Sequence, residues 1–568
     1  MKINRFPRPK GRSSLNFAQN SLHLRHKFRS FFAQNKDYVV LAIILILGLS
    51  LRLWRINIPL LEFEPSRQVQ TAEITRNLFR GGFNILQPAV NFYGPKEVLY
   101  ILEFPGLNTA VAFLYLLNGG VDETLGRLFS VLGWIISFLF LYRISKKLIG
   151  EKLSLITVVF YSLSPMSVLV SRSFQPDQWM ITLSLGSIFY ALIWNEKKKL
   201  IYLIISALLA SVASLLKIPA FIFTVIPILL LILHQKTAHR FSYSLLYVLI
   251  SFLPSLIWYQ YAYFVAKTNI LVNQENFSLS NWFRPALFLD YKYYATVFGW
   301  NYNQVILPIG LVLFVVGLFT GYKLPRAKNP RYSLSSLHER AENSWYSEVC
   351  IRSRIYLWTD SLWCSASKYK KMKFIYFWLL GIAIYFFIFN RHSMVHEYYN
   401  LPFLPVASIF IALGTMKAAK NFRHNWFVYS FIFLMIGISA LPQIFTKAYR
   451  PIDRFRFVTE TGKEVQRLTK QDDLTIGSMD SGPTVIYYSN RNGWSFDIEG
   501  KNNPPVNGYR LKSEEYLEYL RSRGAVIFAS ADKKRLLSNP GFANYMYSKY
   551  KTLVENNNFV IFGLTSAN

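Results

Sequence analysis

Residues 38–56 read YVVLAIILILGLSLRLWRI, and residues 57–68 continue as NIPLLEFEPSRQ. A run of about 20 apolar residues is long enough to cross a bilayer as a single helix. The polar stretch that follows places two carboxylates, Glu62 and Glu64, directly at the boundary of that span. Because the same alternation of apolar run and polar loop recurs along the chain, the sequence predicts a protein that crosses a membrane many times.

The composition supports this interpretation. Of the 568 residues, 52% are hydrophobic, 17% aromatic and only 17% charged, which is too apolar for an ordinary soluble protein of this length. The formal net charge is +32, which in a soluble protein would indicate a nucleic-acid partner. Here the bases cluster between apolar runs, so contact with membrane lipid explains them and no nucleic-acid partner is expected. The two cysteines, Cys350 and Cys364, lie in one basic loop and carry no functional signal.

The apolar runs define the predicted fold class, an α-helical polytopic membrane protein with about 11 to 13 transmembrane helices. A shorter run at 109–117 is too brief to span and is expected at the membrane interface. The predicted spans are 38–56, 125–142, 153–170, 178–194, 200–216, 219–234, 242–263, 303–321, 374–390, 400–416 and 426–445.

The distribution of basic residues predicts the orientation of these spans. With the N-terminus in the cytoplasm, the inner segments hold roughly 32 Lys and Arg, whereas the outer loops hold about nine in a larger total length. The inner segments are 1–37, 143–152, 195–199, 235–241, 322–373 and 417–425, and the outer loops are 57–124, 171–177, 264–302 and 391–399. We therefore expect a multi-pass protein of the cytoplasmic (inner) membrane whose C-terminal region lies on the outer, periplasmic side.

The chain divides into three predicted parts: a basic cytoplasmic segment at 1–37, a transmembrane domain at 38–446 and a periplasmic α/β domain at 447–568. The last has a helical pattern at 453–470, strand candidates at LTIGSM and TVIYYS, a helix followed by a strand at 513–530, and a final strand at FVIFGL. It is interpreted as a docking or lid domain. For the basic loop 322–373, disorder and a partner site both stay open.

The first outer loop, 57–124, contains the first group of candidate functional residues. Its segment QVQTAEITRNLFRGG predicts an amphipathic helix on the membrane surface that stops at Gly-Gly. A carboxylate such as Glu64 at the membrane boundary can accept a proton or hold a divalent cation, and Arg67 can bind a phosphate through paired donors. The alternative is a solvated loop with local ion pairs. Further candidates in this loop are Glu62, Gln68, Tyr93, Lys96 and Glu103.

Candidates in the other outer loops fall on the same predicted face. Asp177 and Arg172 occupy a tight turn between two spans, where Asp177 either acts chemically or caps a helix. Lys217 sits between two apolar runs and either snorkels outward or faces a cavity. The stretch NRHSMVHEYYNLPFLP at 390–405 adds Arg391, His396, Glu397 and Tyr398, although tyrosines at this depth are also typical of an interfacial aromatic belt.

These motifs resemble a known family in their order and sidedness. Six stretches are similar to the outer loops and the second span of polytopic C-type glycosyltransferases (GT-C): SRQVQTAEITRNLFRGGFNILQP, EFP, GRLFSVL, SRSFQPD, LLKIP and HEYYNLPFLP. The branch is the protein O-mannosyltransferase and aminoarabinose-transferase-like superfamily, family 39, and the resemblance covers roughly residues 40–445. It implies transfer of a hexosyl or pentosyl group from a polyprenyl-monophosphate carrier to a protein, lipid or polysaccharide acceptor outside the membrane, by one inverting displacement.

The resemblance also implies roles for the candidates. Glu64 matches the first acid and Asp177 the second, and either is the residue that would hold a divalent cation. Contact with the lipid phosphate is implied for Arg67, Lys217, Arg391 and His396. Contact with sugar or acceptor is implied for Gln68, Tyr93, Lys96, Glu103, Arg172, Glu397 and Tyr398.

The sequence departs from the family pattern at one point. The family signature begins with Asp, often Asp-Glu, whereas this chain has Glu-Phe-Glu-Pro at 62–65. Glu62, Glu73 or Glu103 therefore stay open as alternative bases. A transporter or flippase, a polymerase or ligase of lipid-linked sugars, and a non-catalytic scaffold stay open as alternative functions.

Overall fold

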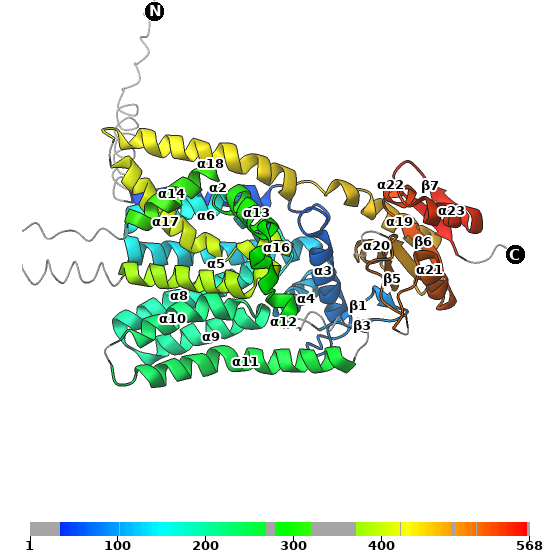
Figure 1. The fold of residues 1–568 in the computed structure, drawn as a ribbon, viewed down its shortest axis with the longest axis horizontal. Helices are drawn as coiled ribbons and strands as arrows, with labels where there is room; N and C mark the ends of the chain where they lie inside the picture. The colour runs from blue at the N-terminus through cyan, green and yellow to red at the C-terminus, as the bar shows by residue number, and fades with distance from the viewer. Residues whose placement is uncertain are drawn as a thin grey trace, which may run out of the picture.

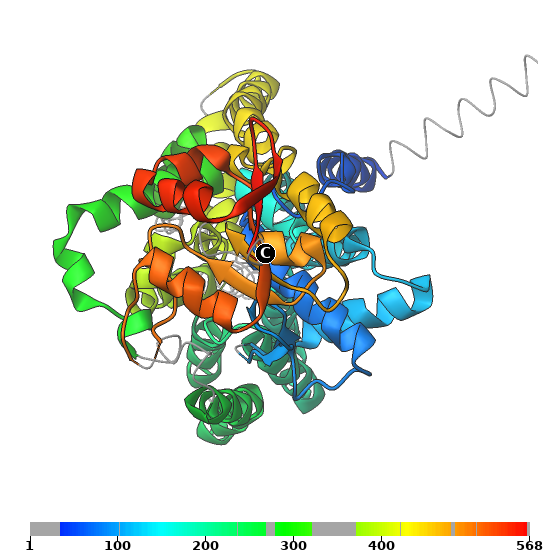
Figure 2. The ribbon, with the colours of Figure 1, turned by 90° about the vertical axis from the view of Figure 1, so that its right-hand side faces the viewer.

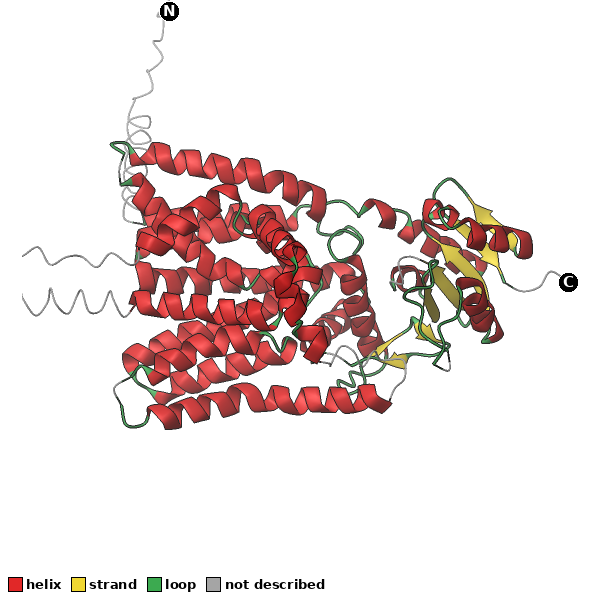
Figure 3. Cartoon of the chain, in the orientation of Figure 1, coloured by secondary structure: helices red, strands yellow, loops and turns green. Residues whose placement is uncertain are grey.

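The computed structural model describes residues 35–101, 103–235, 237–268, 279–320, 371–420, 422–478, 483–506 and 508–564. A helical bundle occupies one end of the molecule, and a smaller domain that contains the strands occupies the other (Figures 1 and 3). Most of the predicted basic segment 1–37 and almost all of the loop 322–373, with both cysteines, lie outside the described residues.

Each predicted span corresponds to a helix of the bundle or to a bent pair of helices, which confirms the polytopic fold. Near-continuous apolar sequence forms these helices because backbone groups in lipid must be satisfied within the segment. The helices are α2 (Lys36–Leu53), α5 (Glu123–Ile149), α6 (Glu151–Leu163), α7 (Pro165–Arg172), α8 (Asp177–Lys197), α9 (Leu200–Leu216), α10 (Ala220–Leu233), α11 (Arg240–Thr268), α13 (Tyr291–Trp300), α14 (Pro308–Thr320), a helix over Lys371–Ile388, α17 (Phe403–Ala419) and α18 (Asn425–Ala448).

Two spans are broken. By length and composition, four described helices can each cross a membrane alone, or up to six if each bent pair counts as one span. The first pair, α6 and α7, bends by 61° at Ser164–Pro165, where the proline ring removes a backbone donor. The second pair consists of the helical segment Tyr291–Val305, which begins with α13, and α14, and it bends by 99° immediately before Pro308. Both breaks face each other, because the Ser164 hydroxyl donates to the carbonyls of Gln304 and Val305.

The first outer loop forms α3 (Pro65–Arg80), α4 (Gly106–Asn118) and the short strands β1 (Ala89–Val90), β2 (Tyr93–Gly94) and β3 (Val98–Leu99). α4 covers the predicted interfacial run. α3 is the predicted amphipathic helix, but it does not simply lie on a membrane surface. Most of its residues, polar ones included, are buried because α3 packs on α4 and contacts α20 (Thr484–Ser489) of the C-terminal domain.

The C-terminal domain is built on a six-stranded sheet in the order β2-β5-β4-β6-β8-β7. Figure 2 views the molecule from the side of this domain. Its own strands are β4 (Leu474–Ser478), β5 (Gly493–Phe496), β6 (Ala525–Ser530), β7 (Lys551–Glu555) and β8 (Val560–Gly563). Its longer helices are α19 (Val458–Leu468), α21 (Ser513–Ser522) and α23 (Pro540–Lys549), with the short α22 (Lys533–Leu537) between the last two.

Two features of this domain differ from the sequence predictions. The predicted strand TVIYYS is the helix α20, because β4 and β5 run parallel and a parallel pair needs a crossover between its strands. The edge strand β2 comes from the first outer loop and pairs antiparallel with β5, Tyr93 opposite Trp494. The C-terminal domain is therefore joined to the bundle by a shared sheet as well as by the chain itself.

Candidate active site

A polar cavity of roughly 430 Å³ lies at the end of the bundle that carries the C-terminal domain. Its walls come from the first outer loop, the turn after α9, the segment between the Lys371–Ile388 helix and α17, and the C-terminal domain. The lining residues are Glu64, Ser66, Arg67, Gln70, Phe92, Tyr93, Tyr100, Glu103, Lys217, Ile218, Pro219, Tyr259, Trp282, Phe389, His392, His396, Tyr398, Tyr399 and Pro483.

Glu64 enters the cavity from an unusual backbone position. It is the N-cap of α3 and has φ 48° and ψ 56°, the left-handed region, while Pro65 occupies the first helical turn. A residue other than glycine in this region costs on the order of 1–3 kcal/mol and persists only where its surroundings hold it. The Glu64 Oε1 atom lies 3.8 Å from His396 Nδ1. The structure thus brings together an acid and an imidazole from two distant outer loops.

Lys217 is the centre of a charged network behind Glu64. Its Nζ lies 2.8 Å from Asp177 Oδ1 and 3.8 Å from Glu103 Oε1. The ammonium group also lies over the Tyr398 and Tyr399 rings, 4.4 and 4.7 Å from their centroids. An ammonium between two aromatic faces and an acid is held in place by both cation–π and ionic contacts.

Arg67 is paired with the Oε2 atom of Glu103, whereas Lys217 faces the Oε1 atom of the same carboxylate. Its other nitrogen donates to Gln70 Oε1 at 3.4 Å. The carboxylate of Glu103 raises the pKa of Arg67 despite its burial, so this guanidinium is permanently charged. Arg67 and Lys217 therefore place two cations at the cavity, which suits an anionic group such as a phosphate.

His392 adds a neutral imidazole to the cavity wall. Burial and the nearby charges of His396, Lys217 and Arg391 lower the pKa of His392 to about 3. Its ring packs against that of Tyr399, with centroids 4.9 Å apart. At neutral pH this side chain donates or accepts a hydrogen bond without adding charge.

An apolar groove of about 640 Å³ continues from the polar cavity. The two spaces share Ile218, Tyr259, Trp282 and Phe389, so they lie side by side. Beyond these, the groove is lined mainly by apolar and aromatic side chains of α10 and α11. The combined site therefore has a charged end and an apolar end.

Seven of the residues predicted from the sequence line the cavity, and Asp177 contacts it through Lys217. The seven are Glu64, Arg67, Tyr93, Glu103, Lys217, His396 and Tyr398. Their roles stay predictions, but their convergence from three separate segments is a property of the fold.

Two predicted residues form hydrogen bonds with backbone groups instead of lining the cavity. Arg172 donates to the carbonyls of Arg52, Trp54 and Arg55, and its guanidinium lies over Tyr449. Both ends of the Gln68 amide are engaged, by the carbonyl of Phe63 and by the N–H of Phe174. Neither side chain lines the cavity, so the contact with sugar or acceptor expected of them has no support in the structure.

Three more predicted residues lie elsewhere. Glu397 accepts from Gln304 and Lys447, at 2.5 and 2.6 Å, outside the cavity lining. Arg391 donates to Asn281 and also lies outside it. Lys96 is exposed on the loop between β2 and β3.

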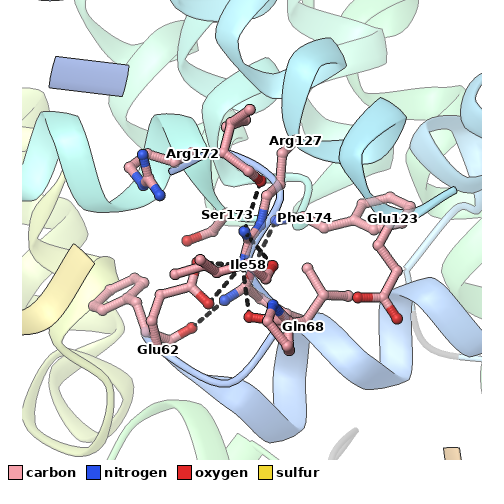
Figure 4. A network of polar contacts seen from close by, with 12 residues as sticks. Ile58, Glu62, Gln68, Glu123, Arg127, Arg172, Ser173 and Phe174 are labelled. Carbon is pink, nitrogen blue, oxygen red and sulfur yellow. Dashed lines mark hydrogen bonds and ion pairs between the residues drawn. The ribbon is translucent and has the colours of Figure 1, made fainter. Parts of the chain in front are cut away.

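Figure 4 shows where the alternative acid Glu62 lies. Its carboxylate is buried and paired with Arg127 at 2.5 and 2.6 Å, and burial raises its pKa. The other alternative, Glu73, is buried beside Arg76 at 3.3 Å, and burial raises its pKa to about 7. Neither acid lines the cavity, which leaves Glu64 and Glu103 as the acids that do among the residues the structure describes.

The cavity also includes residues that the sequence reasoning did not select, among them Gln70, Tyr100, Tyr259, Trp282, His392 and Tyr399. His392 and Tyr399 stood within a quoted cluster, so the signal was present. Tyr259 lies within a long apolar helix, and its exposure to the cavity depends on helix packing that no local pattern reveals.

The donor set does not favour a metal centre of the usual kind. Among the described residues, no group of three or more His, Cys, Asp and Glu side chains is close enough to hold an ion. Glu64 and His396 supply two donors, and Asp177 is occupied by Lys217.

Comparisons with known proteins found one matching family model and several solved structures with a similar fold. A family model described as dolichyl-phosphate-mannose-protein mannosyltransferase matches residues 105–258. No curated protein matches the chain. The crystal structure of ArnT from Cupriavidus metallidurans in the apo state is similar with a TM-score of 0.56 and 13% identity, covering 93% of this chain and 98% of ArnT. ArnT bound to undecaprenyl phosphate gives a TM-score of 0.54 at 12% identity, with the same coverage.

At such low identity these structures establish the fold. The expectation of a C-type glycosyltransferase architecture, a polytopic helical bundle with a C-terminal strand-containing region, is confirmed at that level. The chain is thus a multi-pass membrane protein with the fold of ArnT, in which residues 105–258 match the mannosyltransferase family model.

Proposed function

We propose that this protein is a membrane glycosyltransferase that transfers a sugar from a polyprenyl-monophosphate carrier to an acceptor. One observation carries the proposal: an apolar groove adjoins the polar cavity with its two cations, and the two spaces share four lining residues. A polyprenyl phosphate has the matching chemistry, an anionic head and a long apolar tail. The match of residues 105–258 to a family of dolichyl-phosphate-dependent transferases, and the similarity to a protein crystallised with undecaprenyl phosphate, support the same ligand class.

The charged residues fit the departing phosphate. Lys217 and Arg67 stand at the cavity end of the groove, where the phosphate of a lipid lying in the groove would arrive. Charge builds on the phosphate oxygen as the sugar leaves, so fixed cations stabilise the transition state more than the ground state. Each cation is paired with a carboxylate in the free protein, Lys217 with Asp177 and Arg67 with Glu103.

Glu64 is the proposed general base. The acceptor hydroxyl oxygen forms a bond to the anomeric carbon as the bond from that carbon to the phosphate oxygen breaks. The hydroxyl proton passes to the Glu64 carboxylate, the polyprenyl phosphate leaves, and the anomeric configuration inverts. Asp177 holds Lys217 in place, while Tyr93 and Tyr398 offer aromatic surfaces for the sugar.

Orientation and acceptor belong to the same proposal. The distribution of Lys and Arg supports an orientation with the cavity and the C-terminal domain on the outer side of the inner membrane. Pro483 of the C-terminal domain forms part of the cavity wall, and we expect a protein, lipid or polysaccharide acceptor to approach from that side.

The test is mass spectrometry of polyprenyl-phosphate lipids from a deletion strain. The strain is complemented with wild type, Glu64→Gln, Asp177→Asn or the matched control Glu97→Gln, which changes an exposed acid of the same outer loop. We expect one polyprenyl-monophosphate sugar to accumulate in the deletion strain and to disappear with wild type and Glu97→Gln only.

The other outcomes are informative. Relief by all four chains would keep the transferase and remove both acids from its chemistry. A lipid pool that does not change on deletion would contradict the proposed function and favour a transporter or a scaffold.

A further inference from the structure

The loop that joins α2 to α3, residues 54–63, determines where Glu64 lies. We propose that Arg127 of α5 is a positioning residue for Glu64, and that Tyr488 of the C-terminal domain completes the same support from outside. This inference rests on the proposed function of Glu64. It assigns the C-terminal domain a part in organising the active site rather than a docking role alone.

Arg127 binds the loop along its length. Its Nη1 donates to the carbonyls of Ile56 and Ile58 at 2.8 and 2.7 Å, and its Nη2 donates to the carbonyl of Pro59 at 3.1 Å. The same guanidinium holds the Glu62 carboxylate with both oxygens (Figure 4). One fully buried side chain thus fixes the loop up to two residues before Glu64.

The ends of the loop are held by other buried groups. Arg172 binds the carbonyls of residues 52, 54 and 55, where α2 ends. Gln68, one turn into α3, binds the carbonyl of Phe63 and the N–H of Phe174. Every stage of the approach to Glu64 is therefore anchored to the bundle by a side chain.

Tyr488 reaches this loop from the C-terminal domain. Its hydroxyl accepts a hydrogen bond from the Leu60 N–H at 2.8 Å and donates to Glu123 at 3.1 Å. Glu123 precedes Arg127 by one turn of α5, so Tyr488 links the loop to the same helix that carries Arg127. A second contact from the same side, the Ile452 N–H to the carbonyl of Leu61 at 2.9 Å, accompanies it.

These contacts explain how Glu64 keeps its left-handed backbone conformation. A glutamate relaxes readily from the left-handed region unless the residues before it are fixed. The loop is fixed by Arg127 and Tyr488, and α3 begins at Pro65 immediately afterwards. Loosening the loop would let Glu64 leave the cavity without removing any group that contacts the lipid phosphate.

The experiment compares Arg127→Lys and Tyr488→Phe with matched controls in the full-length protein. Arg52→Lys changes another fully buried arginine, whose partners lie in α2, α6 and α7, and Tyr545→Phe removes a hydroxyl that donates to Glu518. Three quantities are measured: turnover of donor lipid isolated from the deletion strain, binding of undecaprenyl phosphate, and hydrogen–deuterium exchange at residues 56–66.

For Arg127→Lys we expect kcat to fall about 100-fold, since a misplacement of about 1 Å costs that much, with KM and undecaprenyl phosphate binding within about threefold of wild type. For Tyr488→Phe we expect a fall of about tenfold, the effect of losing the one hydrogen bond that its hydroxyl accepts from the loop, at Leu60. Both variants exchange faster at residues 56–66. The two controls lose thermal stability to a similar degree and keep kcat within about twofold.

An equal fall of kcat in Arg127→Lys and Arg52→Lys at equal stability loss would overturn the inference, as would unchanged exchange at residues 56–66. If wild type turns over no donor lipid, the proposed function itself fails. In that case the exchange measurement alone tests whether Arg127 and Tyr488 hold the loop. Unchanged exchange at residues 56–66 would then overturn the positioning role too.

Discussion

At the scale of single residues, the pair formed by Lys217 and Asp177 allows a sharp test. Both side chains are only 3% exposed, so neither charge is solvated by water. We expect Lys217→Met to lower the free energy of unfolding by about 3–5 kcal/mol, because it leaves a buried carboxylate without its cation. Undecaprenyl phosphate binding is lost with it. Thermal unfolding and lipid binding in nanodiscs measure the two effects.

The double variant Lys217→Met with Asp177→Asn separates these effects. It removes both charges, so most of the lost stability should return, whereas phosphate binding should not. A double variant as unstable as the single one would show that the two residues do not act as a pair.

His392 provides a pH test at the same scale. Its pKa is about 3 in the folded chain, below the ordinary value near 6.5, so the unfolded chain binds a proton first as pH falls. The stabilisation from a neutral His392 is complete above pH ~6.5 and is lost progressively toward pH ~3. We expect the Tm of wild type to fall more between pH 7.5 and 5 than the Tm of His392→Gln. Parallel curves for the two chains would contradict the lowered pKa.

Much of the residue-level site could be predicted because the outer loops of a polytopic protein must share one face. That constraint alone gathered Glu64, Arg67, Lys217 and His396. It could not distinguish a side chain that enters the cavity from one that turns back to bind the backbone, as Arg172 does. That choice depends on which carbonyls the neighbouring loop leaves unpaired, and the sequence does not show this.

At the scale of elements, α14 and α17 cross through a pair of glycines. A Cβ added to Gly414 would lie 1.9 Å from the carbonyl oxygen of Leu313, and one added to Gly317 would lie 1.9 Å from that of Phe410. Small residues allow helices in lipid to approach this closely. We expect Gly414→Ala to cost about 1–3 kcal/mol by forcing the helices apart.

Gly437→Ala in α18 is the matched control, because a Cβ there meets nothing within 4 Å. The Tm of this variant should equal or slightly exceed the Tm of wild type, since alanine favours a helix more than glycine. Equal destabilisation by both changes would show that the glycine crossing is not tight.

Elements were predicted well where one local signal determines them. Apolar length gave the spans, and the strands β4, β6 and β8 followed from short runs between turn residues. The prediction was wrong for 484–489, where β-branched and aromatic residues form α20 because two parallel strands must be connected. Strand β2 has two residues and becomes a strand only by pairing with β5, so no local pattern marks it.

At the scale of the whole molecule, the orientation in the membrane is directly testable. The chain has two cysteines, Cys350 and Cys364, both in the predicted cytoplasmic loop. We expect an impermeant maleimide to label them in inverted vesicles and not in spheroplasts. In a chain whose cysteines are replaced by serine, Ser522→Cys on the exposed end of α21 should show the reverse. Labelling of the native cysteines from outside would overturn the proposed topology.

The strand that the first outer loop lends to the C-terminal sheet has a consequence for biosynthesis. Asn91 and Asn492, which hydrogen bond beside the β2–β5 pair, are 401 residues apart in the chain. The ribosome therefore makes the outer loop long before its partner strand exists. Until then β2, with Tyr93, has no strand to pair with while the remaining helices are inserted. Only after residues 493–496 have been translated can β2 pair with β5 and that part of the cavity wall form. The cavity is therefore assembled only after residues 493–496 exist, so a shorter nascent chain carries its acids and cations without an assembled site.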